Sequence, residues 1–215
     1  MIARTIATTT HGRYLVEPSA AEAPLLVGFH GYAELAEAAL DRLRAIPGAD
    51  RWTLVSIQGL NRFYQRRTND VIAGWMTRQD RELVIADNLG YVSAVVDAVI
   101  REWSAARRIA FSGFSQGVAM AFRAAAAADH PVVGVIAAGG DVPPEIPAES
   151  LRRVRSVVLC RGARDEWYTP EKFSADRQRL IDAGVAVSAI AFDGGHEWSK
   201  EVVAAASGFL SEHRP

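Results

Sequence analysis

The sequence predicts an α/β protein whose central sheet is mainly parallel and is covered by helices on both faces. Short apolar runs that suit buried strands alternate with longer segments of helical periodicity through most of the chain. Several of these runs are apolar at nearly every position, which is typical of strands buried on both faces. With 215 residues, the chain has the length of one domain, which we expect to span residues 1–215.

Composition and charge exclude several classes of protein. Hydrophobic residues make up 49% of the chain and charged residues 23%, which suits a substantial core and not a disordered segment. The net charge of −1 gives no electrostatic basis for binding nucleic acid. We expect no signal peptide, and no membrane span because no apolar run reaches ~18 residues. The single cysteine, Cys160, cannot form an internal disulfide, which indicates a cytoplasmic protein with an inert buried thiol.

The expected elements follow these runs in chain order. Residues 4–9 and 13–17 resemble two short strands joined at His11 and Gly12, so the sheet is expected to open with an antiparallel hairpin. Further strands are expected at residues 25–29, 52–57, 109–111, 132–137, 156–160 and 185–192. Helices are expected at residues 34–46, 86–106 (capped by Asp87), 118–128 and 170–183 (ended by Gly184), with a closing helix to about Glu212.

A long segment at residues 58–77 is expected to be a loop. Loops of this length inside compact domains often carry function. Trp75 and Met76 are candidates for contact with substrate. The arginines suit either a pocket wall that favours polar or anionic substrates or a solvated basic loop. Its basic and other aromatic side chains are Arg62, Phe63, Tyr64, Arg66 and Arg67.

A Gly-x-Ser-x-Gly pattern at residues 113–117 lies between the strand at 109–111 and the helix at 118–128. A serine at the tip of such a turn has a strained backbone that lifts its hydroxyl clear of the sheet. Glycine is required on either side because a side chain there would collide with the adjoining strand or helix. The start of the following helix directs N–H groups at the same point. The pattern therefore predicts Ser115 as a nucleophile.

A serine nucleophile needs a base and a carboxylate that orients the base. In this architecture the reactive groups lie at the carboxyl ends of the strands. Asp165 follows the strand at 156–160 and His196 follows the last strand, in the chain order Ser, Asp, His that this kind of sheet uses. We therefore predict Ser115, His196 and Asp165 as a triad, and Asp141 remains an alternative acid because it also follows a strand.

Several other residues lie at the predicted site. Gly31 would let the backbone approach closely, so that the N–H of Tyr32 points inward. His30 precedes the serine at a strand end, and we interpret it as structural, holding its loop by hydrogen bonds. Three aromatic side chains adjoin the predicted acid and base and suit either a hydrophobic substrate rim or packing between loops. These are Trp167, Tyr168 and Trp198.

The chain resembles the α/β-hydrolases and is similar to their phospholipase/carboxylesterase (acyl-protein thioesterase-like) branch. The matching motifs are Phe29-His30-Gly31, Gly113-Phe114-Ser115-Gln116-Gly117, residues 162–165 and Gly195-His196, in matching order over residues 25–210. The resemblance implies that Tyr32 and Gln116 supply the N–H groups of an oxyanion hole. Two departures concern the substrate: Glu166-Trp167-Tyr168 replaces the family's Pro-Val-Val, and Ala33 replaces a second glycine after His-Gly.

These observations predict an α/β-hydrolase with a minimal lid or none, which hydrolyses carboxylic esters, with thioesters as an open alternative. The expected partner is a small soluble ester, with no metal, organic cofactor, nucleic acid or membrane span. The oligomeric state is open, a homodimer included. Two other classes also remain open: another reaction on the same triad (acyl transfer, carbon–carbon bond lysis or cofactor-free peroxide chemistry), and a non-catalytic ligand binder.

Overall fold

The computed structural model describes residues 1–213 and contains a seven-stranded sheet with the order β1-β3-β2-β6-β7-β8-β9. All neighbouring strands are parallel except β1, which runs antiparallel to β3. Every residue of β2, β3, β6 and β7 is buried, as the apolar runs predict. The strands are β1 (Tyr14–Glu17), β2 (Leu25–Phe29), β3 (Thr53–Ile57), β6 (Ile109–Phe114), β7 (Val132–Ala138), β8 (Ser156–Gly162) and β9 (Ala186–Phe192).

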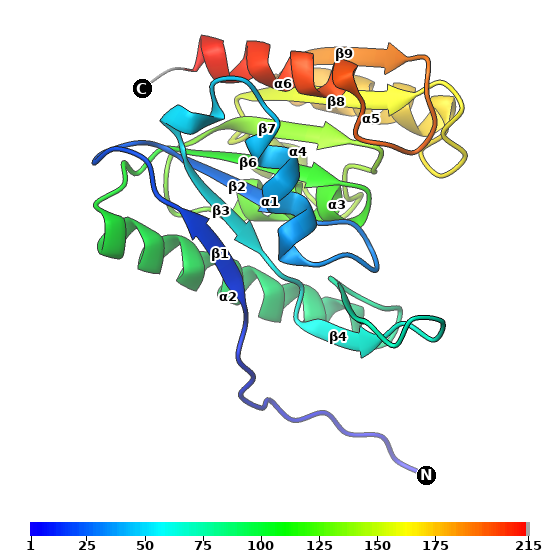
Figure 1. Ribbon diagram of the computed structural model, residues 1–215. Helices are drawn as coiled ribbons and strands as arrows, with labels where there is room; N and C mark the ends of the chain where they lie inside the picture. The colour runs from blue at the N-terminus through cyan, green and yellow to red at the C-terminus, as the bar shows by residue number, and fades with distance from the viewer. Residues whose placement is uncertain (214–215) are drawn as a thin grey trace.

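Helices cover both faces of this sheet (Figure 1), which confirms the predicted fold class. One apolar cluster joins alternate strand residues to the helices α2 (Arg81–Trp103), α3 (Gln116–Ala127), α4 (Ala148–Leu151) and α5 (Pro170–Asp182). The second cluster joins the intervening strand residues to α1 (Ala36–Arg44), the 3₁₀ turn η1 (Ala49–Arg51) and α6 (Lys200–Glu212). Successive residues of a strand point to opposite faces, so each strand contributes to both clusters.

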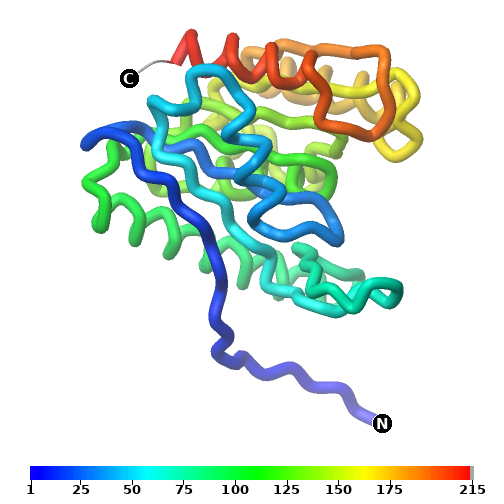
Figure 2. The backbone as a smooth tube through the Cα atoms, viewed as in Figure 1, coloured from blue at the N-terminus to red at the C-terminus, as the bar shows by residue number. Residues whose placement is uncertain are grey.

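The N-terminal hairpin prediction is wrong. Residues 4–9 form no strand and are exposed, and this segment leads away from the sheet (Figure 2). β1 pairs instead with β3, with Leu15 opposite Ser56. The outer edge of β3 gives β1 a partner that buries it partly, whereas a further strand outside β1 would gain little burial.

The segment at 58–77 is also more ordered than predicted. It contains a small antiparallel hairpin, β4 (Asn61–Tyr64) and β5 (Val71–Gly74), with Phe63 opposite Ile72. Glu34 forms an isolated bridge to Ala73, which attaches this hairpin to the loop after β2. The predicted long loop is thus a hairpin fixed beside the carboxyl end of β2.

The helix α2 differs from its predicted boundaries and composition. It begins at Arg81, so Asp87 lies inside the helix and does not cap it. We expected no membrane span. Among the described helices, however, α2 is long and apolar enough to meet a simple test of length and composition for crossing a membrane. Its buried valines, Val92, Val96 and Val99 among them, pack in the core of the sheet, so the finding is weak evidence for a span.

Candidate active site

Ser115 stands on a strained turn between β6 and α3. Its backbone has φ 54° and ψ −122°, a conformation that side-chain-bearing residues rarely adopt. The Ser115 N–H donates to the carbonyl of Ala138 on β7 at 2.9 Å, which holds the turn against the sheet. A Cβ at Gly113 would lie 2.4 Å from the carbonyl oxygen of Gly117. The glycines are therefore required by close backbone approach, as the motif predicts.

His196 and Asp165 meet at the carboxyl ends of β9 and β8. His196 Nδ1 lies 2.8 Å from Asp165 Oδ2. The other carboxylate oxygen, Oδ1, accepts hydrogen bonds from the N–H groups of Trp167 at 2.9 Å and Tyr168 at 3.0 Å. Burial opposes ionisation of this carboxyl, but the hydrogen bonds from Tyr168 and His196 outweigh it and hold the pKa of Asp165 below its ordinary value. An ionised carboxylate is therefore available to orient the imidazole.

The turn after β7 lies beside both Ser115 and the His196–Asp165 pair. A Cβ at Gly139 would lie 3.1 Å from Cε1 of His196 and 3.4 Å from Oδ2 of Asp165. A Cβ at the next residue, Gly140, would lie 2.3 Å from the carbonyl oxygen of Ser115. The ring of Phe114, beside the serine, lies 5.0 Å from the imidazole of His196. All three triad candidates thus gather around two residues that have no side chain.

The alternative acid, Asp141, has a different partner. Its Oδ2 lies 3.2 Å from Nζ of Lys172, which also donates to the carbonyl of Trp167 at 3.0 Å. The hydrogen bond to His196 is made by Asp165. The geometry therefore favours Asp165 over Asp141 as the orienting carboxylate.

The backbone around Tyr32 and Gln116 suits the binding of an oxyanion. The neighbouring N–H groups are engaged, Gly31 with a carboxylate oxygen of Glu34 and Ala33 with the carbonyl of Ala73. Within residues 1–213, the N–H of Tyr32 donates to no protein acceptor. A Cβ at Gly74 would lie 3.3 Å from the Tyr32 ring and 3.4 Å from Oε1 of Gln116, so these two residues are neighbours. Both N–H groups therefore lie at the same end of the sheet as Ser115.

His30 is fully buried and occupies both ring nitrogens in hydrogen bonds. Nε2 accepts from the N–H of Gly59 at 2.9 Å, and Nδ1 donates to the carbonyl of Gly31 at 2.7 Å. Its carbonyl accepts from the indole N–H of Trp75 at 2.9 Å. Burial lowers the pKa of His30 below the ordinary 6.5. These contacts confirm the interpretation of His30 as a structural residue.

The buried His30 predicts a loss of stability in mild acid. Below the ordinary histidine pKa of 6.5, His30 binds a proton in the unfolded chain, but burial keeps it neutral in the folded chain. The free energy of unfolding therefore falls as pH decreases. Urea unfolding between about pH 7.5 and pH 5 should show a smaller pH dependence in His30→Gln than in the natural chain. His11→Gln, at an exposed position, is the control. An equal pH dependence in all three proteins would contradict the assignment.

A depression of 210 Å³ opens beside the serine. Trp167, with 76% of its surface exposed, is one of the lining residues, and its contact with substrate stays a prediction. Among residues 1–213, no cluster of His, Cys, Asp and Glu has an arrangement that could hold a metal ion. The depression is lined by Ser115, Gln116, Ala119, Gly139, Gly140, Asp141, Trp167 and Lys172.

Two predicted substrate residues are corrected by the structure. Trp75 is fully buried and packs its ring edge-on against Phe29 at 5.3 Å, in the core. Tyr168 is 1% exposed, and its hydroxyl donates to Oδ2 of Asp176 at 3.1 Å. Both rings therefore pack inside the protein. A large aromatic side chain suits a core and a substrate rim equally well, so its type alone gave the wrong location.

The other two candidates are half-buried. Trp198 packs edge-on against Phe114 at 6.5 Å, and its indole N–H has no acceptor within residues 1–213. Met76 accepts a hydrogen bond on its carbonyl from the side chain of Gln116 at 3.3 Å. Contact of either side chain with substrate stays a prediction.

A residue that the sequence reasoning missed, Arg161, holds the turn that carries Asp165. It lies at the end of β8, is 6% exposed, and donates to the carbonyls of Tyr168 at 2.6 Å, Ala163 at 3.2 Å and Asp165 at 3.3 Å. The available signal was an arginine that directly follows the apolar run of the strand expected at residues 156–160. Three carbonyl acceptors explain how this guanidinium is tolerated in the interior.

The comparisons with known proteins agree with this architecture. The phospholipase/carboxylesterase family model matches residues 11–214. No curated protein matches the chain significantly. A carboxylesterase of Bacillus cereus is 16% identical, with TM-score 0.72 over 94% of this chain and 95% of that one. A carboxylesterase of Mesorhizobium loti is 20% identical, with TM-score 0.72 over 87% and 88%.

SOBER1 of Arabidopsis thaliana is 16% identical, with TM-score 0.69 over 88% of this chain and 98% of that one. At these identities the solved structures establish the fold alone. The family model covers nearly the whole chain, including the segments that carry Ser115, Asp165 and His196. The chain therefore belongs to the phospholipase/carboxylesterase family of α/β-hydrolases.

Proposed function

We propose that the protein is a serine hydrolase that cleaves carboxylic esters through an acyl-enzyme. The observation that carries the proposal is the Asp165–His196 hydrogen bond of 2.8 Å, made beside the two glycines that also face the strained Ser115 turn. A strained nucleophile turn, a base and an ionised orienting carboxylate are the parts that this chemistry requires.

In the proposed first step, Ser115 Oγ attacks the ester carbonyl carbon as Nε2 of His196 takes the hydroxyl proton. Asp165 stabilises the imidazolium that forms. The N–H groups of Tyr32 and Gln116 donate to the oxyanion, and the loss of one such donor costs about 100-fold or more in rate. The tetrahedral intermediate then expels the alcohol, which receives the proton from His196 and leaves the acyl group on Ser115.

In the second step, water takes the place of the alcohol. His196 removes one proton from the water, whose oxygen attacks the acyl carbon. Collapse of this intermediate returns the proton to Ser115 and releases the carboxylic acid. The same sequence would cleave a thioester, with a thiol as the leaving group. The residues present supply every proton transfer.

The substrate that we propose is a small soluble ester. The depression beside Ser115 has a volume of 210 Å³ and opens to solvent next to the exposed indole of Trp167. The arginines of the β4–β5 hairpin are exposed, and none of them lines the depression. A cytoplasmic location is also a proposal. It fits the single cysteine, which is buried and whose thiol pKa burial raises to about 12.

The test is intact-mass analysis after treatment with a fluorophosphonate, followed by peptide mapping. We expect a single adduct on Ser115, no adduct in Ser115→Ala, and kcat/KM for p-nitrophenyl acetate lower in that variant by at least about 10,000-fold. Ser211→Ala, at an exposed serine of α6, is the matched control and should label normally. Folded protein that fails to label would overturn the proposal and favour a non-catalytic binder. Labelling without hydrolysis would favour another reaction on the same triad.

A further inference from the structure

One face of α3 leads from the nucleophile to a second hollow. Ser115, Ala119, Arg123 and Ala126 are spaced three or four residues apart, so they lie along the same side of the helix. The depression at Ser115 extends to Ala119. Beyond Arg123 lies a hollow of 290 Å³ with mainly apolar walls between α2, α3 and the loop after β7. It is lined by Ile85, Leu89, Arg123, Ala126, Ala127, Glu145, Ile146, Pro147 and Ser150.

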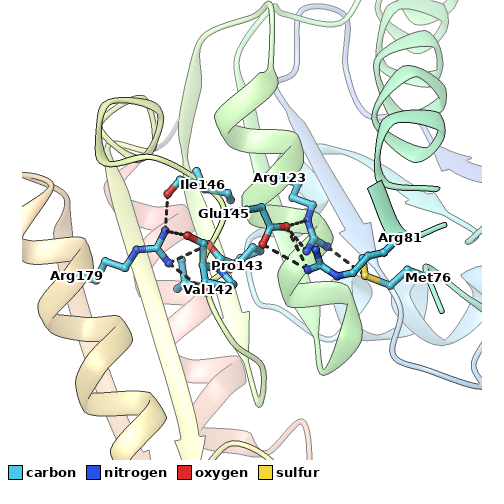
Figure 3. Close-up of polar contacts among 9 residues, drawn as sticks. Met76, Arg81, Arg123, Val142, Pro143, Glu145, Ile146 and Arg179 are labelled. Carbon is cyan, nitrogen blue, oxygen red and sulfur yellow. Dashed lines mark hydrogen bonds and ion pairs between the residues drawn. The ribbon is translucent and has the colours of Figure 1, made fainter. Parts of the chain in front are cut away.

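The Arg123–Glu145 ion pair lies between these two spaces along α3. Glu145 Oε1 accepts from Nη2 of Arg123 at 2.6 Å and from Nε at 2.9 Å. The Arg123 side chain is only 4% exposed, and its Nη1 lies 3.7 Å from Sδ of Met76. Arg81 of α2 approaches the same carboxylate at 3.4 Å. Figure 3 shows Arg123 in contact with both Glu145 and Met76, with Arg81 beside the same carboxylate.

The loop that carries Glu145 is fixed from its other side by α5. Arg179 donates to the carbonyls of Pro143 at 2.9 Å and Val142 at 3.3 Å, and also to that of Ile146 (Figure 3). Asp176, one turn earlier in α5, accepts the N–H of Val142 at 2.9 Å. Glu145 is therefore held in place by a braced loop.

We propose that the Arg123–Glu145 pair determines acyl-chain specificity by separating the catalytic depression from the apolar hollow. The inference rests on the proposed esterase function. Arg123 lies two helical turns after Ser115, about 12 Å along the axis, within reach of the acyl group of a bound ester. A hydrocarbon chain that reached the pair would desolvate Glu145 without offering a hydrogen bond. The natural protein should therefore prefer short acyl chains, and removal of the pair should admit long ones.

The test needs paired substitutions because replacing Glu145 alone would leave the buried guanidinium of Arg123 without its carboxylate partner. Arg123→Ala/Glu145→Ala removes both side chains and joins the two spaces. Arg123→Met/Glu145→Gln removes both charges but keeps most of the bulk, so the partition stays filled. Arg44→Ala/Glu17→Ala removes an exposed ion pair between α1 and β1, and controls for the loss of an ion pair elsewhere.

The measurement is kcat/KM for p-nitrophenyl acetate, butyrate, hexanoate, octanoate and decanoate. In the natural chain we expect kcat/KM to fall once the acyl chain meets the pair. In Arg123→Ala/Glu145→Ala each further CH₂ of the acyl chain that is buried should raise kcat/KM by up to about fourfold. The decanoate-to-acetate ratio should therefore rise at least about tenfold, while the other two variants keep a short-chain preference.

A second change tests the hollow itself. Ala127 is exposed at its wall, so Ala127→Trp should fill the hollow and cancel the gain for decanoate in the Arg123→Ala/Glu145→Ala background. If the Arg123→Ala/Glu145→Ala variant fails to fold, a second measurement takes the place of the ester series. It is the rate at which p-nitrophenyl alkylphosphonates of increasing alkyl length inactivate the natural chain. Inactivation that speeds up steadily to the decyl compound would overturn the inference.

The outcome is separable from that of the proposed function. A natural chain that labels at Ser115 and hydrolyses acetate, with an unchanged decanoate-to-acetate ratio in the folded Arg123→Ala/Glu145→Ala variant, would overturn the partition alone. A natural chain that does not label at Ser115 would overturn the proposed function, and the partition with it.

Discussion

Replacing Asp165 by Asn is expected to lower kcat for ester hydrolysis by about 10,000-fold with little change in the fold. Both carboxylate oxygens of Asp165 accept hydrogen bonds. Oδ1 accepts from the N–H groups of Trp167 and Tyr168, and Oδ2 accepts from Nδ1 of His196. An amide has one accepting oxygen. If that oxygen remains with the two backbone donors, its NH₂ group faces Nδ1 and favours the tautomer that places the proton on Nε2, where the base must be free.

The rival carboxylate provides the matched control. Asp141→Asn removes the ion pair to Lys172 at the edge of the depression and should reduce kcat far less than Asp165→Asn. Circular dichroism of both variants would establish that they fold, and kcat with p-nitrophenyl acetate would rank them. The reverse order of effects would assign the orienting role to Asp141.

Replacing Gly117 by Ala is expected to destabilise the protein by about 3 kcal/mol or more, because it forces one backbone away from another. A Cβ there would lie 2.2 Å from the carbonyl oxygen of Phe29 and 2.7 Å from that of His30. Neither is a flexible side-chain end, so α3 would have to move away from β2. That movement would separate Gln116 from Tyr32, and activity should fall together with the free energy of unfolding.

Gly90 is the control for a glycine-to-alanine change in a helix. It lies inside α2, and a Cβ there would meet no atom within 4 Å. Gly90→Ala should therefore stabilise the protein by about 0.5–1 kcal/mol. Urea unfolding of the two variants would give changes of opposite sign. Similar free energies of unfolding for both would contradict the close approach of α3 to β2.

The structure accounts for the departure from the family's acid motif. The donors to Asp165 Oδ1 are the N–H groups of Trp167 and Tyr168, whatever their side chains. The proline of the usual Pro-Val-Val continuation would fall at position 166, whose N–H is not one of these two donors. The carboxylate can therefore be held in the same way by either sequence, and the changed side chains alter the rim at Trp167 and the packing at Tyr168.

The sequence determined the strand-and-helix alternation, the turn at Ser115 and the arrival of Asp165 and His196 at one edge of the sheet. These features depend on patterns that are local in the chain. A short, fully apolar run is typical of a strand that is buried on both faces, and the two glycines around a serine are visible directly in the sequence. Parallel strands then bring their carboxyl ends together whatever the details of packing. The role of His30 followed in the same way, from its place at a strand end.

Tertiary structure alone decided the pairing of β1 with β3, the β4–β5 hairpin, the burial of Trp75 and Tyr168, and the Arg123–Glu145 pair. Each depends on which surface a distant segment leaves free. An edge strand pairs with the neighbour that buries it most. An aromatic side chain gains stability wherever its apolar surface is removed from water, so its type does not determine where it is buried. Arg123 and Glu145 lie on separate elements, and only the packing of the loop after β7 against α3 brings their charges into contact.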